Sequence, residues 1–519
     1  MTRINTNVQS LIASTALGAN KNALNQSLER LSTGLRINTG KDDPAGLIAS
    51  QNLRAEKSAL GAAISNADRA DQVVNIAEGG LEEITGLLNQ VQGLVTATAN
   101  TAGLSKEEKA ANQLQIDSIL QTIDRVASAT SFQGLKLLNG NFDYATTAVA
   151  STVGAFHVNG AKLGYGEQRT VNVLVVKSAQ VGGYFLSFGA SKLQLAGANK
   201  QFVIEVGGAL GSRELSFSSG TTLNNIQDAI NSFTPVLGVR AKVSGTQGIR
   251  LESTGYGSDQ FVSIRVSDDG GISGSQVGIY GLQSGNAGAV DSTAKTAFGT
   301  AINRVSDYGQ DVQATVNGIR ATTRGTVARI STDFLDVDID LKYSTAPSST
   351  ANAAKLGTVT AFTITGGGAD FQMASRVDIA GKVSLGISTV AARDLGGNNY
   401  TNGLGVTTTN FLSDLGTGRG LNVVDGDLNG AQATIEASIR AVSTMRGRLG
   451  AFQANTIGAT TRSLNISLEN TTAAESTIRD TDFASETASL TRAQILVSSS
   501  TQILGIANQQ PQSALQLLG

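Results

Sequence analysis

The sequence predicts an α+β multidomain protein, in which long α-helical coiled-coil regions from both chain ends pack together and a β-rich middle is inserted between them. Residues 1–140 contain 12 Gly and one aromatic residue, and residues 425–519 contain seven Gly and two aromatic residues. The intervening block contains 41 Gly and 21 aromatic residues. Ala- and Leu-rich segments with few aromatics favour long helices, whereas β-branched and aromatic runs punctuated by Gly favour strands and turns.

Three helices are predicted in the N-terminal block. Asp43 and Pro44 mark the start of the long second helix, because Pro is favoured at the first helical position. Ser105 and Glu108 form a capping box for the third helix. An apolar stripe in the first helix comprises Leu17, Leu24, Leu28, Leu31 and Leu35.

Apolar residues recur every seven positions along the second helix. The main seam is Leu53, Leu60, Ala67, Val74, Leu81, Leu88 and Val95. A companion seam is Ala63, Ala70, Ala77, Ile84 and Val91. Two parallel seams predict a helix that is packed in a coiled coil and not isolated in solvent.

The C-terminal block carries matching seams. The first comprises Leu428, Ile435, Val442 and Leu449, after which the register slips by one residue to Ile457 and Leu464. That slip predicts a local change in supercoiling. A last helix, after Asp480 to Asp482, carries Phe483, Leu490, Val497 and Leu504. Because lone helices are marginal in water, the seams of the two chain ends are expected to pack on each other.

The middle reads as strands separated by Gly-rich turns. Strands are predicted over 171–176, 201–206, 249–253 and 261–266. One helix is predicted over 221–233, with Thr222 as its cap. The polar stretch 344–355 is expected to be a loop, at which two middle domains could meet.

Composition limits the function. The net charge is −2, which argues against nucleic-acid or anionic-membrane binding, because such binding depends on clustered Lys and Arg. The chain has no Cys, and His157 is its single His. Thiolate zinc sites, disulfides and cysteine nucleophiles are therefore excluded, and a Ser-His-Asp triad would need His157. We expect no cofactor and no enzymatic activity. A lone strand histidine such as His157 is expected to be structural.

Neither a membrane span nor a cleaved signal peptide is expected. No stretch reaches the run of about 18 apolar residues that a spanning helix needs. The N-terminal segment lacks a basic start followed by an apolar core. These features indicate a cytoplasmic protein or one exported without a cleaved signal.

Short motifs at both ends resemble those of bacterial flagellin. Near the start they are Ile4–Asn7, Leu31–Asn38, Lys41–Leu47, Ile123–Val126 and Phe132–Gly140. Near the end they are Leu449–Ala451, Ile478–Ala484, Leu490–Leu496 and Ala507–Gln509. The stretch Ser219–Asn231 is similar to a small repeat motif of flagellin and hook-protein middles.

This resemblance implies a structural subunit that polymerises into the flagellar filament for swimming motility. Residues 1–43 and 477–519 would be the helices of an inner-tube domain, and 44–142 with 425–476 would be the two halves of a helical spoke domain. Residues 143–424 would be a variable, solvent-facing middle of one or two domains, with a split near 290–355. Alternatives are a hook–filament junction protein, or a flagellin frame that displays an enzymatic or adhesive middle domain.

The resemblance also implies partners and a location. The chain would form a helical homopolymer, alone or with other flagellins, in the extracellular flagellum. It would be exported by the flagellar type III secretion route. A secretion chaperone would bind the C-terminal helices, and filament cap and hook-junction proteins would contact the polymer. Neither nucleic acid nor membrane is an expected partner.

An immune-receptor site is expected to be degenerate. Flagellins that the innate flagellin receptor recognises present basic residues and a Leu on the long helix, with an acidic residue on its neighbour. At the corresponding positions this chain has Gln90, Gln92, Leu94 and Gln115.

Two motifs resemble ligand sites but favour plain structural interpretations. Gly34 to Lys41 resembles a phosphate-binding loop with incorrect spacing, and a turn between helices is expected there. Asp425, Asp427, Asn429 and Glu436 fit the spacing of a calcium loop, but capping of a helix N-terminus is the preferred interpretation.

A third acidic set is Asp336, Asp338 and Asp340, which alternate along a predicted strand and should share one solvated face. The sequence leaves paired carboxylates for hydrolysis open, because their separation depends on the tertiary structure.

Overall fold

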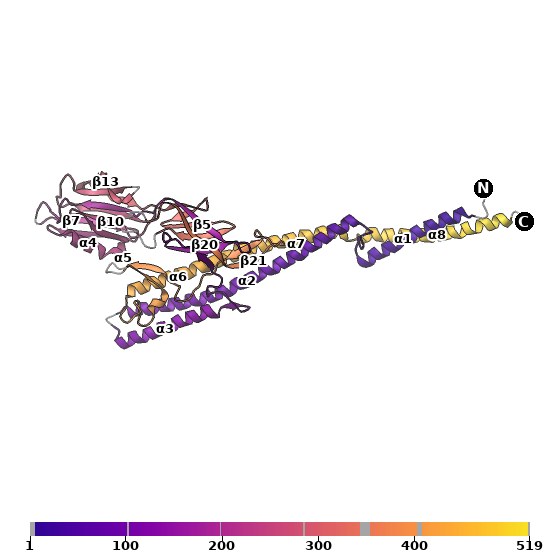
Figure 1. Cartoon of the computed structure of the whole chain (residues 1–519), viewed down its shortest axis with the longest axis horizontal. Coiled ribbons are helices and arrows are strands. Elements are labelled where there is room, and N and C mark those ends of the chain that lie inside the picture. The colour runs from indigo at the N-terminus through magenta and orange to yellow at the C-terminus, as the bar shows by residue number, and fades with distance from the viewer. Residues whose placement is uncertain are drawn as a thin grey trace. The chain divides into compact units, whose positions relative to one another are not determined.

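The computed structural model describes residues 6–100, 103–197, 199–283, 286–342, 353–401 and 407–516. The chain forms two compact units. Unit 1 comprises residues 1–75, 371–382 and 447–519, and unit 2 comprises residues 76–370 and 383–446. Most of the predicted loop 344–355 and part of the motif Ile4–Asn7 lie outside the described residues. Long helices at both chain ends and a β-rich middle confirm the predicted α+β fold class (Figure 1).

The long helices follow the predicted order. They are α1 (Val8–Thr33), α2 (Pro44–Thr98), α3 (Lys106–Ala129), α6 (Leu428–Ala451), α7 (Gly458–Arg479) and α8 (Phe483–Gln516). Short helices in the middle are α4 (Leu223–Asn231), α5 (Thr234–Leu237), η1 (Phe298–Thr300) and η2 (Leu412–Leu415).

The start signals read from the sequence are confirmed. The Asp43 side chain accepts a hydrogen bond from the Gly46 N–H at the start of α2, at 2.9 Å. Ser105 and Glu108 form the predicted capping box of α3. Thr222 caps α4. Each cap satisfies backbone N–H groups that have no partner within their helix.

In unit 2, α2 is tied to α3 and to α6 by polar contacts. The Asn112 amide of α3 donates to the Thr98 hydroxyl at 3.0 Å. Arg446 of α6 pairs with Glu78 at 2.7 Å. Large apolar side chains of these helices are fully buried and belong to the predicted seams, including Leu81, Ile84, Leu88, Val91, Ile435 and Val442.

The one-residue register slip in the C-terminal seam coincides with a π-helical turn, η3 (Phe452–Ile457). A π-turn accommodates one extra residue, because its hydrogen bonds run from i to i+5. Leu449, Ile457 and Leu464 are consequently all buried, although the first two are eight positions apart. The Gln453 amide in this turn donates to Asp71 at 2.8 Å and to Asn75 at 2.9 Å. The slip is thus absorbed by a local helix defect.

Two sheets of unit 2 form a first β domain. One sheet has the strand order β16 (Ile319–Arg320), β15 (Gln313–Val316), β5 (Arg169–Lys177), β20 (Gly357–Gly367) and β3 (Tyr144–Thr147). The other has the order β17 (Thr322–Arg324), β18 (Val327–Ser331), β19 (Leu335–Asp340) and β4 (Ala155–Ala161). Alternating buried residues of both sheets form one core, in which the rings of Phe156 and Phe362 stack at 4.3 Å.

Two further sheets form a second β domain. One has the order β13 (Asn286–Thr296), β12 (Gly278–Gln283), β6 (Gly183–Ser187), β10 (Gly248–Ser253) and β9 (Val239–Ser244). The other has the order β14 (Val305–Tyr308), β11 (Phe261–Asp268), β7 (Gln201–Gly208) and β8 (Ser212–Ser218). The apolar face of α4 and four phenylalanines, Phe188, Phe202, Phe217 and Phe298, pack in its core. All four strands predicted for the middle are present.

The second β domain is inserted within the first. Its core uses residues between Leu186 and Ala301, whereas the first core uses residues on both sides of that stretch. At the crossing, Gln180 and Gln310 exchange both backbone hydrogen bonds, at 2.8 and 3.0 Å. The sequence predicts a split between two middle domains near 290–355, and Gln310 lies in that range; because the second domain is an insertion, the chain also passes between the domains at Gln180. Further short strands are β1 (Ser131–Phe132), β2 (Leu135–Lys136), β21 (Ala369–Gln372), β22 (Lys382–Leu385), β23 (Asn398–Thr401) and β24 (Thr407–Asn410).

Candidate assembly surfaces

The terminal helices α1 and α8 pack side by side and antiparallel (Figure 1). The Asn7 amide donates to the Ala507 carbonyl at 2.7 Å, near the chain ends. At the other end of the pair, Arg30 lies 3.7 Å from Glu486. The two segments that are furthest apart in sequence are therefore direct neighbours.

The seam between α1 and α8 consists of small and polar residues alternating with leucine and valine. On α1 it follows three- and four-residue steps through Ser10, Ala13, Leu17, Asn20, Leu24, Ser27 and Leu31. On α8 it follows Glu486, Leu490, Ala493, Val497, Ser500, Leu504 and Ala507. The most buried members of the seam are Ala and Ser, and its Leu and Val residues are half-buried. The Leu and Val side chains of the seam are therefore only partly covered within one chain.

Two members of the predicted α1 stripe do not lie on this seam. Leu28 is 47% exposed, because it is one position, or about 100° of helix rotation, away from buried Ser27. Leu35 follows the end of α1 and bridges to Asp480. On α8, Phe483 is 58% exposed, whereas the other three predicted residues are half-buried on the seam.

Both terminal helices expose an apolar face that the sequence analysis missed. Its members are Val8, Leu11 and Ile12 on α1 and Ile495, Leu496, Ile503 and Ile506 on α8, each between 44% and 69% exposed. A second apolar stripe, out of phase with the leucine heptad, was the signal that could have revealed it. Large exposed apolar patches on a protein usually mark an interaction surface.

The predicted residues of the long helices are mostly buried within the chain. In unit 1, Leu60 packs with Ala63 and Leu464, and Leu53 is half-buried. Val74, Leu81, Leu88, Ile435, Val442 and Leu449 are also buried. These side chains are available for packing within the subunit but not for contacts with a neighbouring copy.

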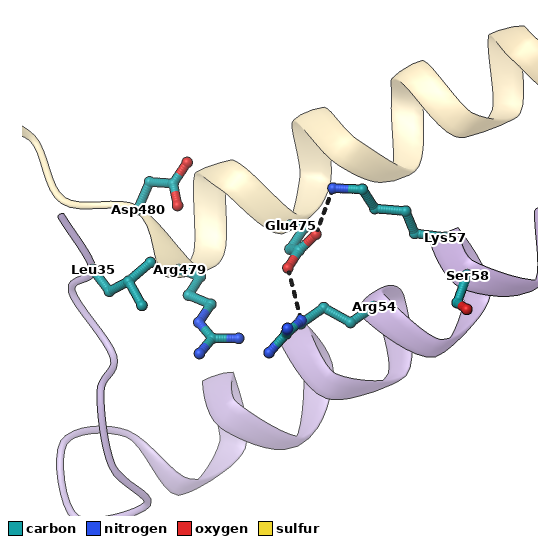
Figure 2. A pocket seen from close by; sticks show the side chains of 7 residues that line it. All are labelled: Leu35, Arg54, Lys57, Ser58, Glu475, Arg479 and Asp480. Atoms are coloured by element: carbon teal, nitrogen blue, oxygen red, sulfur yellow. Dashed lines mark hydrogen bonds and ion pairs between the residues drawn. The ribbon is translucent and has the colours of Figure 1, made fainter. Parts of the chain in front are cut away.

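A cleft of about 480 Å³ lies where the turn after α1 meets the end of α7 in unit 1 (Figure 2). Backbone contacts build it: the Arg36 N–H donates to the Arg479 carbonyl at 2.7 Å, and the Thr481 N–H donates to the Gly34 carbonyl at 3.0 Å. Arg54 and Lys57 of α2 both pair with Glu475 of α7, at 3.6 and 3.3 Å.

The turn that resembles a phosphate loop connects α1 and α2. Its centre is organised by Asp42, whose carboxylate accepts hydrogen bonds from the N–H groups of Asn38 and Thr39 at 3.2 and 2.9 Å. These bonds, the Thr39 bond first among them, hold the pKa of Asp42 below its ordinary value. The turn expected between two helices is present.

The calcium-like sequence forms the start of α6. Asp427 accepts hydrogen bonds from the Asn429 and Gly430 N–H groups, both at 3.1 Å, and so caps the helix. Glu436 lies within α6 and accepts a hydrogen bond from Gln432. The Asp425 N–H donates to the Asn422 side chain. Across the described parts of the chain, no group of three His, Cys, Asp or Glu residues is placed to hold a metal ion.

The remaining predicted positions lie on helix and strand surfaces. Gln90 of α2 and Gln115 of α3 are exposed, and Gln92 and Leu94 are half-buried. His157 is exposed on β4.

The alternating aspartates of β19 share one face, as predicted. This face is half-buried, whereas a solvated face was predicted. The Asn159 amide covers it by donating to Asp336 and Asp338 at 3.1 and 2.8 Å.

Paired terminal helices with outward apolar faces, joined to long heptad-packed helices, define a structural protein suited to self-assembly. The chain matches the bacterial flagellin N-terminal helical region over residues 4–143 and the C-terminal helical region over residues 433–518. The flagellin hook IN motif matches residues 201–255. These regions together cover more than half of the chain, and the chain belongs to the bacterial flagellin family.

Relatives extend the match to the full length. Flagellin A of Helicobacter pylori is 28% identical over 99% of both chains. The flagellin of Salmonella typhimurium is 27% identical, again over 99% of both chains. Among solved structures, FliC from Burkholderia pseudomallei is 13% identical with a TM-score of 0.22, covering 74% of this chain and 99% of its own.

As a flagellin, the chain is a structural subunit that polymerises into the extracellular flagellar filament. None of the helices in the described ranges has a stretch apolar enough to cross a bilayer.

Proposed function

We propose that this subunit polymerises by burying the outward apolar faces of α1 and α8 against neighbouring copies. The observation that supports this most directly is the contrast between the two sides of the helix pair. The Leu and Val residues of the seam are half-buried within one chain, whereas Leu11, Ile503 and Ile506 of the outward faces are each more than half exposed.

The energetics favour coupling between folding of the terminal helices and assembly. Ordering each residue costs about 1–2 kcal/mol of backbone entropy, and a seam whose Leu and Val side chains are only half-buried offsets part of that cost. Burying a Leu- or Ile-sized side chain contributes about 1.5–3 kcal/mol. Neighbouring copies that cover the outward faces supply this contribution only in the polymer. We therefore expect rapid amide hydrogen exchange of α1 and α8 in the monomer and strong protection in the filament.

Substitution of the outward face tests the proposal. Changing Ile503 and Ile506 together to Gln should abolish polymerisation of purified subunits while leaving the rest of the chain folded. The matched control changes Thr491 and Ser498, exposed polar positions on another side of the same helix, to Gln, and it should polymerise normally. Removing residues 477–519 should also abolish polymerisation. Normal filaments from the double Ile variant, or slow exchange of both helices in a verified monomer, would contradict the proposal.

The same apolar face suits the partners that the resemblance implies. A secretion chaperone would cover α8 before export through the flagellar type III route, which needs no cleaved signal. Filament cap and hook-junction proteins would meet the ends of the polymer. A chaperone that binds α8 should lose affinity for the Ile503 and Ile506 double variant. The role is structural and not enzymatic, and no feature of the described residues favours a junction protein or a displayed enzyme.

We also propose that this flagellin activates the innate flagellin receptor only weakly. Uncharged Gln90, Gln92 and Gln115 replace groups that would form charge-assisted hydrogen bonds at a contact centre, where the loss of such bonds costs a few kcal/mol. A receptor-reporter response equal to that of a strong agonist flagellin would contradict it.

A further inference from the structure

The cleft between the turn after α1 and the end of α7 is lined by more cationic than anionic side chains. Arg54, Lys57 and Arg479 line it together with Glu475 and Asp480. Glu475 is occupied, since it pairs with both Arg54 and Lys57. Figure 2 shows the Asp480 carboxylate pointing away from the arginines. Among the described residues, Arg479 has no ion-pair partner.

Arg479 is held in place without a counter-ion. Its carbonyl accepts the Arg36 N–H, which fixes the backbone at the end of α7. Its Nε is buried and has no hydrogen-bond partner in the described parts of the chain. A buried donor of this kind costs free energy until an acceptor reaches it. Figure 2 shows the guanidinium groups of Arg54 and Arg479 turned toward each other, an arrangement that an anion between them would stabilise.

The cleft is accessible to a partner. The side chains of Arg54 and Lys57 are 51% and 43% exposed, and their charges lie on the rigid helix α2. In a polymer of identical subunits, a contact that is not self-complementary must join two different sites of the same chain. A neighbouring copy that docked in this cationic cleft would have to present an acidic site from elsewhere on the chain.

Glu82 and Glu83 of α2 meet that requirement. Both are exposed, and neither has an ion-pair or hydrogen-bond partner among the described residues. They are consecutive residues of the helix, and the residues on either side of them, Leu81 and Ile84, are buried. Two adjacent carboxylates can serve two guanidinium groups.

We propose that the Arg54–Arg479 cleft of one subunit binds the Glu82–Glu83 carboxylates of a second copy of this chain. The inference rests on the proposed polymerisation and adds a charged contact to the apolar ones. It supplies a counter-ion for the Arg479 guanidinium, which pairs with no carboxylate in the described parts of a single chain.

Polymerisation of purified monomer on filament seeds tests the cleft. Arg479→Gln should raise the critical concentration about tenfold at low ionic strength, and the difference should shrink in high salt, because exposed pairs are screened. Arg462→Gln, an exposed arginine of α7 outside the cleft, is the matched control and should behave as wild type. Thermal unfolding of each monomer shows whether the substitution acts on assembly or on the fold.

Charge exchange tests the pairing. Arg479→Glu alone and the Glu82→Lys, Glu83→Lys double variant alone should each polymerise poorly. A mixture of the two should form copolymers, because each negative cleft then meets a lysine pair and each unaltered cleft meets the glutamate pair. Failure of the mixture, or wild-type assembly by Arg479→Gln, would overturn the proposal.

A last experiment distinguishes binding of a free anion in the cleft from binding of a second copy of the chain. Inorganic phosphate is titrated into wild-type and Arg479→Gln monomers by calorimetry. Arg479-dependent phosphate binding together with normal assembly of the variant would assign the cleft to a free anion and overturn the subunit contact. Failure of the wild-type chain itself to polymerise would instead contradict the proposed function.

Discussion

Asn20 of α1 donates a hydrogen bond to the hydroxyl of Ser500 of α8, at 2.7 Å, within the seam of the terminal helix pair. Ser500 is buried. A slip of one heptad would place Asn20 opposite Ala493 or Ala507, neither of which has a side-chain acceptor for its hydrogen bond. A single polar residue inside a coiled-coil seam specifies register at some cost in stability. This pair therefore favours the observed alignment of α1 and α8.

Replacing Asn20 with Leu should leave the helices paired but loosen their register. Apolar burial should maintain or raise the helicity of the assembled form, while filaments become heterogeneous in diameter and curvature. Electron microscopy with helical averaging measures this outcome. Asn22→Leu, at an exposed position of α1, is the control and should give uniform filaments. Uniform filaments from Asn20→Leu would show that register is set elsewhere.

Deleting one residue from the π-turn should convert it to regular α-helix. Removal of exposed Ala454 restores seven-residue spacing between Leu449 and Ile457, so both seams stay in phase. We expect circular dichroism close to wild type, a melting temperature within a few degrees, and an altered filament supercoil, because the Gln453 contacts to Asp71 and Asn75 are displaced.

Deleting Ala441 from the regular helix α6 is the comparison for the π-turn deletion. This change rotates the following seam by about 100° and exposes it. We expect the Ala441 deletion to lower the melting temperature markedly. Equal behaviour of the two deletions would mean that the π-turn does not absorb the register slip.

Asp427→Ala should remove the cap of α6 and cost about 1 kcal/mol of unfolding free energy, measured by urea denaturation. Asp425→Ala should cost less than about 0.5 kcal/mol, since no contact of its carboxylate stabilises the helix start. Millimolar calcium should leave the melting temperature of both variants and of wild type unchanged. A calcium-dependent rise in wild type that Asp425→Ala abolishes would restore the calcium interpretation.

Asp307 should make the second β domain less stable as pH rises. Burial raises the pKa of Asp307 above its ordinary value of 3.8, although the Gly183 N–H donates to its carboxylate at 2.8 Å. The folded state therefore binds its proton more tightly than the unfolded state, and this contribution is lost as pH climbs from 3.8 through the raised value.

Asp307→Asn should accordingly raise the melting temperature at pH 7 and have little effect below pH 3.8. Taking the difference from wild type cancels the opposite contributions of Asp42, Glu205 and Asp311, whose pKa values are lowered. The variant should also lower the pKa of Tyr184, which burial first and the Asp307 charge second raise to about 12. A variant that is less stable than wild type at pH 7 would contradict this assignment.

Patterns local to the chain determined much of the architecture. Helix starts at Asp43, Ser105 and Thr222 were predictable because a cap depends on residues only three positions apart. The seams of the long helices were predictable because a helix repeats every 3.6 residues. The flagellin motifs at both ends indicated the family for the same reason, since they are short and contiguous.

Only the tertiary structure decided which faces are covered. Leu28 and Ser27 are adjacent in sequence, yet Ser27 is buried against α8 and Leu28 is exposed, because the phase of the seam depends on the partner helix. The insertion of the second β domain rests on Gln180 and Gln310, whose pairing joins positions far apart in sequence. The cleft at Arg479 likewise requires the turn after α1 to meet the end of α7. Periodicity is a property of one segment, whereas burial and charge balance are properties of segments brought together by folding.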